Sequence, residues 1–242
     1  MEPSIARRSI ITTMAVLICL FGVRVSRAAA PQEQICDISA DYALGHENYP
    51  AAIALHRVLL RSQPDNALAH YHLGFAYGMT GHSSEEIREY LQAVALGLRQ
   101  WDLFLDLGLA YLDQRDYRNA VNVLETSVLL GPGHSEAHFN LAIAYEKAGR
   151  LRDAMREIIA SLRISPADRD ARNTKAIVCA ELGDLRCAHD EWALLIDMAP
   201  NYAPARVNVA ILTGSAQGAL PSDSNMVEIP QLLESASWSE HK

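Results

Sequence analysis

The sequence predicts an all-α superhelix, a solenoid of about five helix-turn-helix units closed by a capping helix. The first observation is a proline period: Pro132, Pro166 and Pro200 are each 34 residues apart, and Pro64 lies 68 residues before Pro132. The second is that small and aromatic residues repeat in the same phase, at Gly74, Gly108, Ala142, Ala176 and Ala210, and at Tyr77, Tyr111 and Tyr145. An ordinary four-helix bundle would explain amphipathic segments but not this fixed phase.

The residue types at these positions suit helical hairpins. Small side chains in the first helix of a unit let the second helix approach closely. Gly149 and Gly183 can take the left-handed conformation that ends a helix, and each proline stops the second helix before the next unit. Because one hairpin cannot bury its apolar face alone, stacked neighbours bury it jointly.

The pattern resembles the tetratricopeptide repeat family, whose signature is a large residue, then Leu-Gly, Tyr, Ala, an aromatic or apolar residue, a small residue and Pro. Residues 135–168 match this signature best. The resemblance implies a solenoid over residues 33–214, about three quarters of the chain. Its units fall at 33–66, 67–100, 101–134, 135–168 and 169–202, with a half unit at 203–214.

The units differ in how fully they match. Unit 33–66 is poor in its first helix, where Cys36, Ser39 and Ala40 replace the large residue, Leu and Gly, as suits an end repeat that lacks one neighbour. Unit 67–100 has Leu98 in place of the closing proline, and Gly97 predicts an irregular join there. Residues 203–214 read as one helix that covers the last hairpin. Residues 215–242 turn to Ser, Gly, Pro, Asp and Asn and read as a flexible tail.

Residues 1–28 read as a secretory signal peptide. Arg7 and Arg8 precede an apolar run from Ser9 to Val23, and small residues follow. The run is shorter than the about 20 residues that a spanning helix needs, and cleavage is expected after Ala28. We therefore expect an exported protein, periplasmic or secreted. The alternative is a protein anchored in the inner membrane that retains residues 9–23 as a transmembrane anchor.

The charge balance disfavours polyanionic partners. The chain has a formal net charge of −8, and removal of residues 1–28 would leave 17 basic and 28 acidic residues, a net charge of −11. Nucleic acid needs clustered Lys and Arg, and anionic lipid attracts basic segments. The sequence therefore predicts no nucleic-acid binding and no direct membrane-surface binding by the mature domain.

Three cysteines remain after the predicted cleavage: Cys36, Cys179 and Cys187. An odd number argues against a disulfide framework. Cys179 occupies the inward tyrosine position of its unit, whereas Cys187 occupies a position that is usually exposed. Free thiols are the preferred prediction, and a bridge between these two is the alternative if their side chains converge.

The search for chemistry finds no catalytic motif. The sequence has no Gly-x-Ser-x-Gly, no His-Glu-x-x-His, no phosphate-binding glycine loop and no Cys-x-x-Cys. Two close histidine pairs, His70 with His72 and His134 with His138, raise the possibility of a metal site. His70 and His138 share one repeat position, however, where the family places a large packing residue. We therefore predict no enzyme, no cofactor and no metal site, and keep a metal-binding protein or enzyme that uses the histidines as the less favoured alternative.

The resemblance implies a binding groove on the concave face, lined by the first helix of each unit. Its predicted members are Tyr71, Phe75, Met79, Leu105, Leu109, Leu112, Asp113, Phe139, Ile143, Glu146, Lys147, Asn173 and Ile177, with Asp102, Glu136, Asp170 and Glu181 at the same repeat positions. Aromatic and aliphatic side chains among carboxylates suit a protein or peptide with apolar side chains and some positive charge. Only Lys147 could serve the basic clamp with which one branch of the family grips a C-terminal carboxylate, so that mode is not expected. The predicted function is a non-enzymatic scaffold or adaptor in envelope assembly or secretion.

Overall fold

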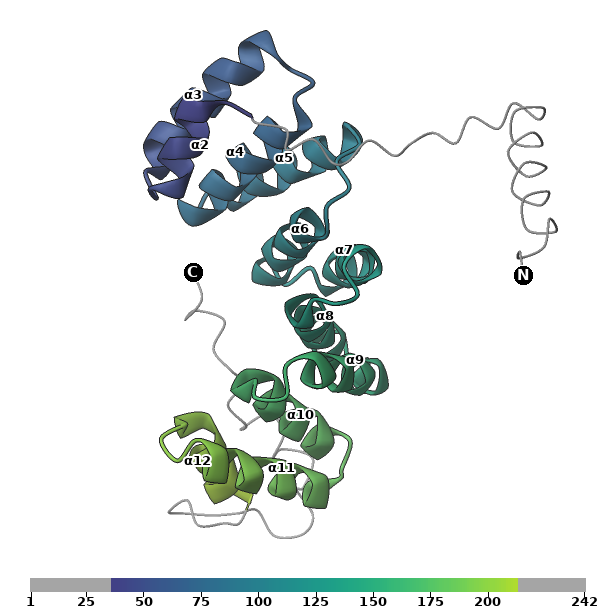
Figure 1. Ribbon diagram of the computed structural model, residues 1–242. Helices are drawn as coiled ribbons and strands as arrows, with labels where there is room; N and C mark the ends of the chain where they lie inside the picture. The colour runs from purple at the N-terminus through teal and green to yellow at the C-terminus, as the bar shows by residue number, and fades with distance from the viewer. Residues whose placement is uncertain (1–35, 213–242) are drawn as a thin grey trace, which may run out of the picture. The chain divides into compact units, whose positions relative to one another are not determined.

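The computed structural model describes residues 36–212, and the predicted signal peptide and tail lie outside them. Within the described residues, which belong to one compact unit, every regular element is a helix. The helices shown in Figure 1 are, in chain order, α2 (Ile38–Gly45), α3 (Tyr49–Ser62), α4 (Ala67–Met79), α5 (Ser83–Ala95), α6 (Trp101–Asp113), α7 (Tyr117–Leu130), α8 (Ser135–Lys147), α9 (Leu151–Ile164), α10 (Arg169–Glu181), α11 (Leu185–Met198) and α12 (Ala203–Leu212).

Consecutive helices pack as hairpins that stack in chain order. The most extensive contacts join α4 with α5, α6 with α7, α8 with α9 and α10 with α11, and each second helix also packs on the first helix of the next unit. First helices begin every 34 residues, at Ala67, Trp101, Ser135, Arg169 and Ala203. The predicted all-α solenoid is confirmed.

Side-chain caps mark many of the helix starts. The Asn66 side chain accepts a hydrogen bond from the Ala69 backbone N–H at 3.0 Å, and Asp184 accepts one from the Cys187 N–H at 2.9 Å. Such caps satisfy backbone donors that a helix leaves free in its first turn. These caps fix the starts of α4 and α11, whereas α5, α6, α8 and α9 begin without a side-chain cap.

The turn inside each hairpin places one residue in the left-handed region, again with a 34-residue period. Gly149 has a φ of 73°, and the equivalent residues Arg115 and Glu47 have φ values of 58° and 57°. A side chain at such a position crowds the backbone, at a cost of roughly 1–2 kcal/mol. An added Cβ at Gly149 would meet no heavy atom within 4 Å, so any penalty there is conformational.

Two substitutions at this turn position should therefore have opposite effects. Arg115→Gly is expected to raise the free energy of unfolding by about 0.5–1 kcal/mol, because it removes left-handed strain at some cost in chain entropy. Gly149→Ala should lower it by about 1 kcal/mol. Urea unfolding followed by circular dichroism measures both, and equal effects of the same sign would contradict this account.

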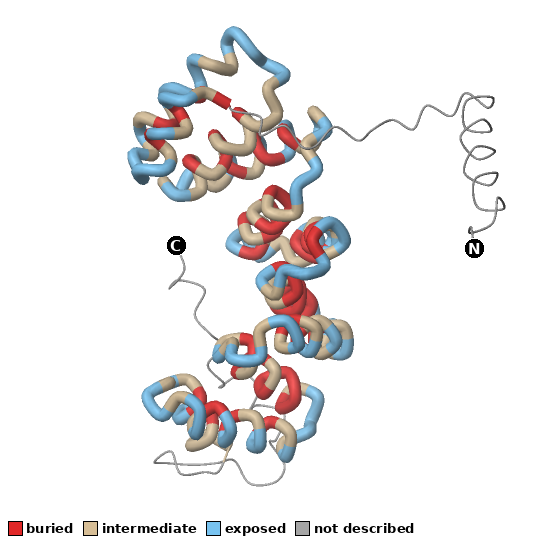
Figure 2. The backbone as a smooth tube through the Cα atoms, in the orientation of Figure 1, coloured by how far each residue is buried: buried red, intermediate tan, exposed pale blue. Residues whose placement is uncertain are grey.

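The core lies where first and second helices face each other, as the buried positions in Figure 2 show. An added Cβ at Gly74 would lie 2.6 Å from Tyr90 Cδ1, and one at Gly108 would collide with the Leu124 side chain. Tyr90 and Leu124 are both fully buried. The small residue of the repeat pattern is thus the contact point between the two helices of a hairpin.

The join between α5 and α6 differs from the others. α5 ends at Ala95, one residue shorter than α3, α7, α9 and α11, and Gly97 follows with a φ of 93°. α5 also packs on α6 less extensively than the other second helices pack on their following neighbours. This is the join where Leu98 replaces the periodic proline.

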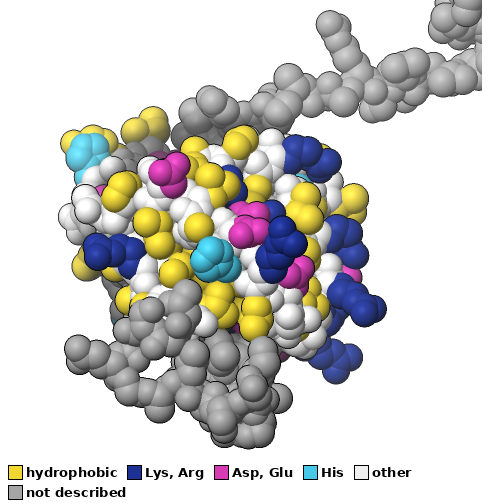
Figure 3. Space-filling model, turned by 90° about the horizontal axis from the view of Figure 1, so that it is seen from below, with side chains coloured by type: hydrophobic (Ala, Val, Ile, Leu, Met, Phe, Trp, Pro, Cys, Tyr) yellow, Lys and Arg dark blue, Asp and Glu magenta, His cyan; other side chains and the backbone are white. Residues whose placement is uncertain are grey.

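α12 covers the last hairpin. Ala205 is fully buried in a cluster with Trp192 and Leu195, and Val209 and Leu212 pack against the same cluster. Figure 3 views this end of the described chain, where hydrophobic side chains lie among charged ones. The half unit therefore acts as the predicted capping helix.

Candidate functional site

The first helices of successive units form one continuous surface. α4 contacts α6, α6 contacts α8, and α8 contacts α10, whereas second helices pack mainly on adjacent first helices. Figure 1 shows α6 and α8 on one side of the stack and α7 and α9 on the other. We call the solvent-facing side of α4, α6, α8 and α10 the first-helix face.

Several predicted groove residues reach solvent on this face. Met79 is 37% exposed, and Asp113 and Lys147 are exposed. The others of this group are half-buried: Tyr71, Phe75, Leu109, Phe139 and Glu146. Aromatic and aliphatic surface is therefore available beside carboxylates on α4, α6 and α8.

The remaining predicted groove residues are buried and serve packing. Leu105, Leu112 and Ile143 belong to the central hydrophobic cluster, and Ile177 belongs to the C-terminal one. Asn173 is fully buried and accepts a hydrogen bond from Trp192 Nε1 at 2.8 Å. These five side chains support the first-helix face rather than line it, because neighbouring units close over them.

The structure adds Asp106, a residue that the sequence pattern did not select. The Tyr71 hydroxyl of the preceding unit donates a hydrogen bond to Asp106 Oδ2 at 2.8 Å. Burial, together with the nearby charges of Asp102 and Glu136, raises the pKa of Asp106 to about 7, although the Tyr71 bond opposes this. The only signal in the sequence was that Asp106 directly follows Leu105, a predicted groove residue.

A second set of neighbouring carboxylates consists of Glu146 on α8 and Glu181 on α10. Burial and the charge of Glu146 raise the pKa of Glu181 to about 7, and Lys147 opposes the shift. Lys147 itself is paired with Glu146, with Nζ 2.9 Å from Oε1. The one basic residue predicted for the groove is thus already engaged by a neighbouring carboxylate.

The sequence model of the tetratricopeptide repeat family matches residues 39–100 and 105–169, which is more than half of the chain. The chain belongs to the tetratricopeptide repeat family. Members of this family generally serve as non-enzymatic scaffolds for protein–protein interaction, and this chain has their fold.

Known tetratricopeptide repeat structures share the fold at low sequence identity. YrrB, described as a TPR protein with an unusual peptide-binding site, is 22% identical over 69% of this chain and 86% of its own, with a TM-score of 0.66. A MamA structure is 19% identical over 69% of this chain and 97% of its own, with a TM-score of 0.64. MamA from Desulfovibrio magneticus RS-1 is 15% identical over 68% and 93%, with a TM-score of 0.64. No curated protein matches the chain.

His70 and His138, which share a repeat position, each form hydrogen bonds to the second helix of their unit and to the loop before the first. His138 Nδ1 lies 2.8 Å from Glu157 Oε2, and its Nε2 lies 3.2 Å from the Pro132 carbonyl oxygen. His70 makes the same two contacts with Glu89 and the Pro64 carbonyl. In these two units the position therefore carries a hydrogen-bonded histidine instead of the large packing residue of the family pattern.

One further unit has a polar contact at this position, and another does not. Arg172 takes the histidine's place and contacts Glu191 and the Pro166 carbonyl. Unit 101–134 has apolar Phe104 and Val123 at the two side-chain positions, in the unit that follows the missing proline. His134 instead stacks on Trp101, with ring centroids 3.7 Å apart. Neither histidine pair noted in the sequence therefore converges on a common ligand position.

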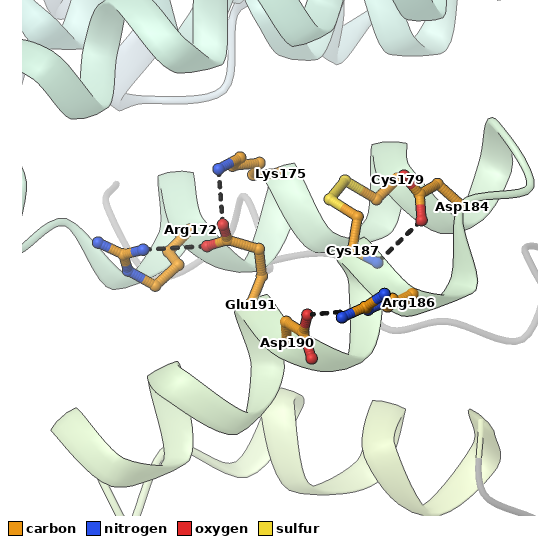
Figure 4. Close-up of a disulfide and its surroundings, with 8 residues drawn as sticks. All are labelled: Arg172, Lys175, Cys179, Asp184, Arg186, Cys187, Asp190 and Glu191. Atoms are coloured by element: carbon orange, nitrogen blue, oxygen red, sulfur yellow. Dashed lines mark hydrogen bonds and ion pairs between the residues drawn. A yellow bond between two sulfur atoms is a disulfide. The ribbon is translucent and has the colours of Figure 1, made fainter.

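The preferred prediction of free thiols is wrong for two of the three cysteines. Cys179 of α10 and Cys187 of α11 form a disulfide across the turn of their hairpin (Figure 4). They converge because Cys179 ends the inward face of the first helix, while Cys187 lies in the first turn of the second, which folds back on it. Cys36 is free and buried.

The described helices include none that is both long and apolar enough to cross a membrane.

Proposed function

We propose that this chain is an exported scaffold that binds a protein or peptide segment carrying apolar side chains and positive charge along the first-helix face. The observation that carries the proposal is the gathering of like-charged carboxylates beside half-buried aromatic side chains on contiguous helices. Asp102, Asp106 and Glu136 come from α6 and α8, and Tyr71 and Phe75 from α4.

The electrostatics favour a cationic ligand. Among the described residues, Asp102, Asp106 and Glu136 form no ion pair, and their mutual repulsion helps to raise the pKa of Asp106. A lysine or arginine side chain placed among them would relieve this repulsion and strengthen binding. Complementary charge also speeds encounter, an effect that salt screens.

The apolar side chains favour a peptide rather than a small ion. Phe75 and Phe139 lie two units apart, half-buried, with their rings packed against the cores below them. Aromatic anchors of this kind dominate the free energy of many protein interfaces. YrrB, which shares this fold, is described as having a peptide-binding site, and that description supports the proposed mode.

The double substitution Phe75→Ala with Phe139→Ala tests the face directly. Peptides selected by the wild-type chain from a random display library should combine Lys or Arg with apolar residues. The double variant should bind them about 30- to 900-fold more weakly, because it loses two anchors worth about 1–2 kcal/mol each. Isothermal titration calorimetry measures the affinities, and circular dichroism checks that helicity is kept.

The matched control is Leu129→Ala with Ile159→Ala on the second helices α7 and α9, where the side chains are 79% and 50% exposed. This pair should leave unchanged both the affinity for the peptides and the weakening of peptide binding by added salt. If the control weakens binding and the phenylalanine variant does not, the second-helix surface is the binding site and the proposal fails.

Export is supported by two separate features. The N-terminal 28 residues have the composition of a signal peptide, and the Cys179–Cys187 disulfide is of a kind that persists in oxidising compartments. An alkaline phosphatase fusion after residue 60 should be active, and the mature chain should begin at Ala29. An inactive fusion would overturn export, whereas an active fusion with an intact N-terminus in the membrane fraction would favour the anchored alternative.

A further inference from the structure

Four side chains with metal-binding chemistry converge at the N-terminal end of the described chain. Cys36 precedes α2, Asp41 lies on α2, His56 on α3 and His72 on α4. One ligand atom from each lies within 4.8 Å of the others. Cys36 and His56 are buried, and Asp41 and His72 are partly buried.

His56 supplies the observation that points to a ligand. Its side chain is fully buried, and Nδ1 lies 2.8 Å from the Ala52 carbonyl oxygen, to which only a protonated nitrogen can donate. Nε2 has no hydrogen-bond partner and faces Asp41 Oδ1 at 3.5 Å. In the neutral ring, a lone pair therefore points at a carboxylate oxygen, an arrangement that a cation between the two would satisfy.

The tautomer of His56 is the one that metal ligands adopt. A histidine that binds metal through one ring nitrogen usually donates its other N–H to a carbonyl or carboxylate, which fixes the ring. In His56 this N–H is at Nδ1, and the Ala52 carbonyl oxygen accepts its hydrogen bond. His72 also faces the cluster, with Nδ1 2.8 Å from Asp41 Oδ1.

Comparison with the other units shows how unusual these residues are. The repeat position of His56 is filled elsewhere by fully buried Tyr90, Leu124, Ile158 and Trp192. The position of Asp41 is filled elsewhere by Phe75, Leu109, Ile143 and Ile177. Only in the first unit do both positions hold metal-ligating side chains, and there the two face each other. A polar pair at these apolar positions needs a compensating partner.

We propose that Cys36, Asp41, His56 and His72 bind a zinc-class transition metal ion that ties α2 to α3 and α4. A thiolate, two imidazoles and a carboxylate are ligands that Zn²⁺ accepts in a tetrahedral site. Bonds of about 2.0–2.3 Å would place neighbouring ligand atoms about 3.3–3.8 Å apart, so small side-chain movements suffice. Four protein ligands leave no open position, which makes the site structural rather than catalytic.

Such a site would compensate for the weak packing of the end helix. α2 buries only Ala40 and Ala43, while Ile38 and Tyr42 are 78% and 66% exposed. A metal ion that binds the folded chain and not the unfolded one would stabilise this end of the array. It would also hold Cys36, which lies just before the start of α2, against α3 and α4.

The test is metal binding to the purified full chain after chelator treatment, using Zn²⁺ alone and then Co²⁺ alone. We expect one Zn²⁺ per chain by mass spectrometry of the metal content, and a rise in melting temperature when Zn²⁺ is added. Co²⁺ should give the absorption of a tetrahedral site with a thiolate-to-metal band. Cys36→Ser should remove that band and weaken Zn²⁺ binding at least about 100-fold, beyond the about 10–100-fold typical for loss of an outer hydrogen-bond partner.

Further variants separate metal binding from folding. His72→Gln should weaken binding as Cys36→Ser does while keeping wild-type helicity, which matters because buried His56→Gln could disturb the core. The matched controls are His138→Gln, which alters an equivalent histidine–carboxylate pair, and Cys179→Ser with Cys187→Ser; both should retain full binding. Absence of bound Zn²⁺ in the wild type would overturn the proposal, and so would wild-type affinity for Zn²⁺ in both Cys36→Ser and His72→Gln.

Discussion

Trp192→Ala is expected to lower the free energy of unfolding by about 3–5 kcal/mol, the range measured when a large buried side chain is truncated. Trp192 is fully buried at the centre of the C-terminal cluster, where it joins α10, α11 and α12. Its Nε1–H donates to Asn173 Oδ1, which also accepts from Asn208 Nδ2 at 3.3 Å. The truncation therefore leaves a cavity and disturbs a buried polar network.

Urea unfolding followed by circular dichroism measures the effect. Because repeat arrays can unfold in parts, the loss should be greatest for the end that contains α10 to α12, and hydrogen exchange can locate it. The control is Leu194→Ala on the same helix, where the side chain is 44% exposed and the loss should stay below about 1 kcal/mol. Similar losses for both variants would show that Trp192 does not organise this end.

Asp106→Asn is expected to raise the free energy of unfolding at pH 8 by roughly 2–4 kcal/mol and to have little effect near pH 4. The folded chain holds the pKa of Asp106 at about 7, mainly through burial, against about 4 in the unfolded chain. Between these values the folded state keeps a proton that the unfolded state has lost, so stability falls as pH rises from about 4 to 7. Asparagine cannot ionise, and its oxygen can still accept the bond from Tyr71.

The measurement is a series of urea titrations from pH 4 to 8. The difference between Asp106→Asn and the wild type should grow with pH and level off above pH 7. Asp65→Asn, at an exposed carboxylate, should change the curve far less. A constant difference at every pH would mean that Asp106 affects stability by packing and not by ionisation.

The periodic pattern alone determined the architecture. Helix positions follow from the 34-residue phase because small residues, turn residues and prolines each act locally or between adjacent helices. Gly74 against Tyr90 and Gly108 against Leu124 are contacts within one hairpin, and the repeat spacing predicts them. The solvent-facing part of the first-helix face, which includes half-buried Phe75 and Phe139, also follows from repeat position.

Tertiary structure decided the features that depend on neighbouring units. Leu105, Leu112, Ile143, Asn173 and Ile177 occupy groove positions by register, yet adjacent helices bury them. The sequence does not show how closely one unit packs on the next, and that distance sets their exposure.

The same reason applies to the groups that meet only in three dimensions. Cys179 and Cys187 converge because α11 folds back on α10. The pKa of Asp106 is raised mainly because packing buries this carboxylate, and the charges of Asp102 and Glu136 add to the shift. Cys36 and His72 are 36 residues apart and come together only when α4 packs on α2 and α3. Sequence period fixes which residues repeat; the packing of one unit on another decides which of them become partners.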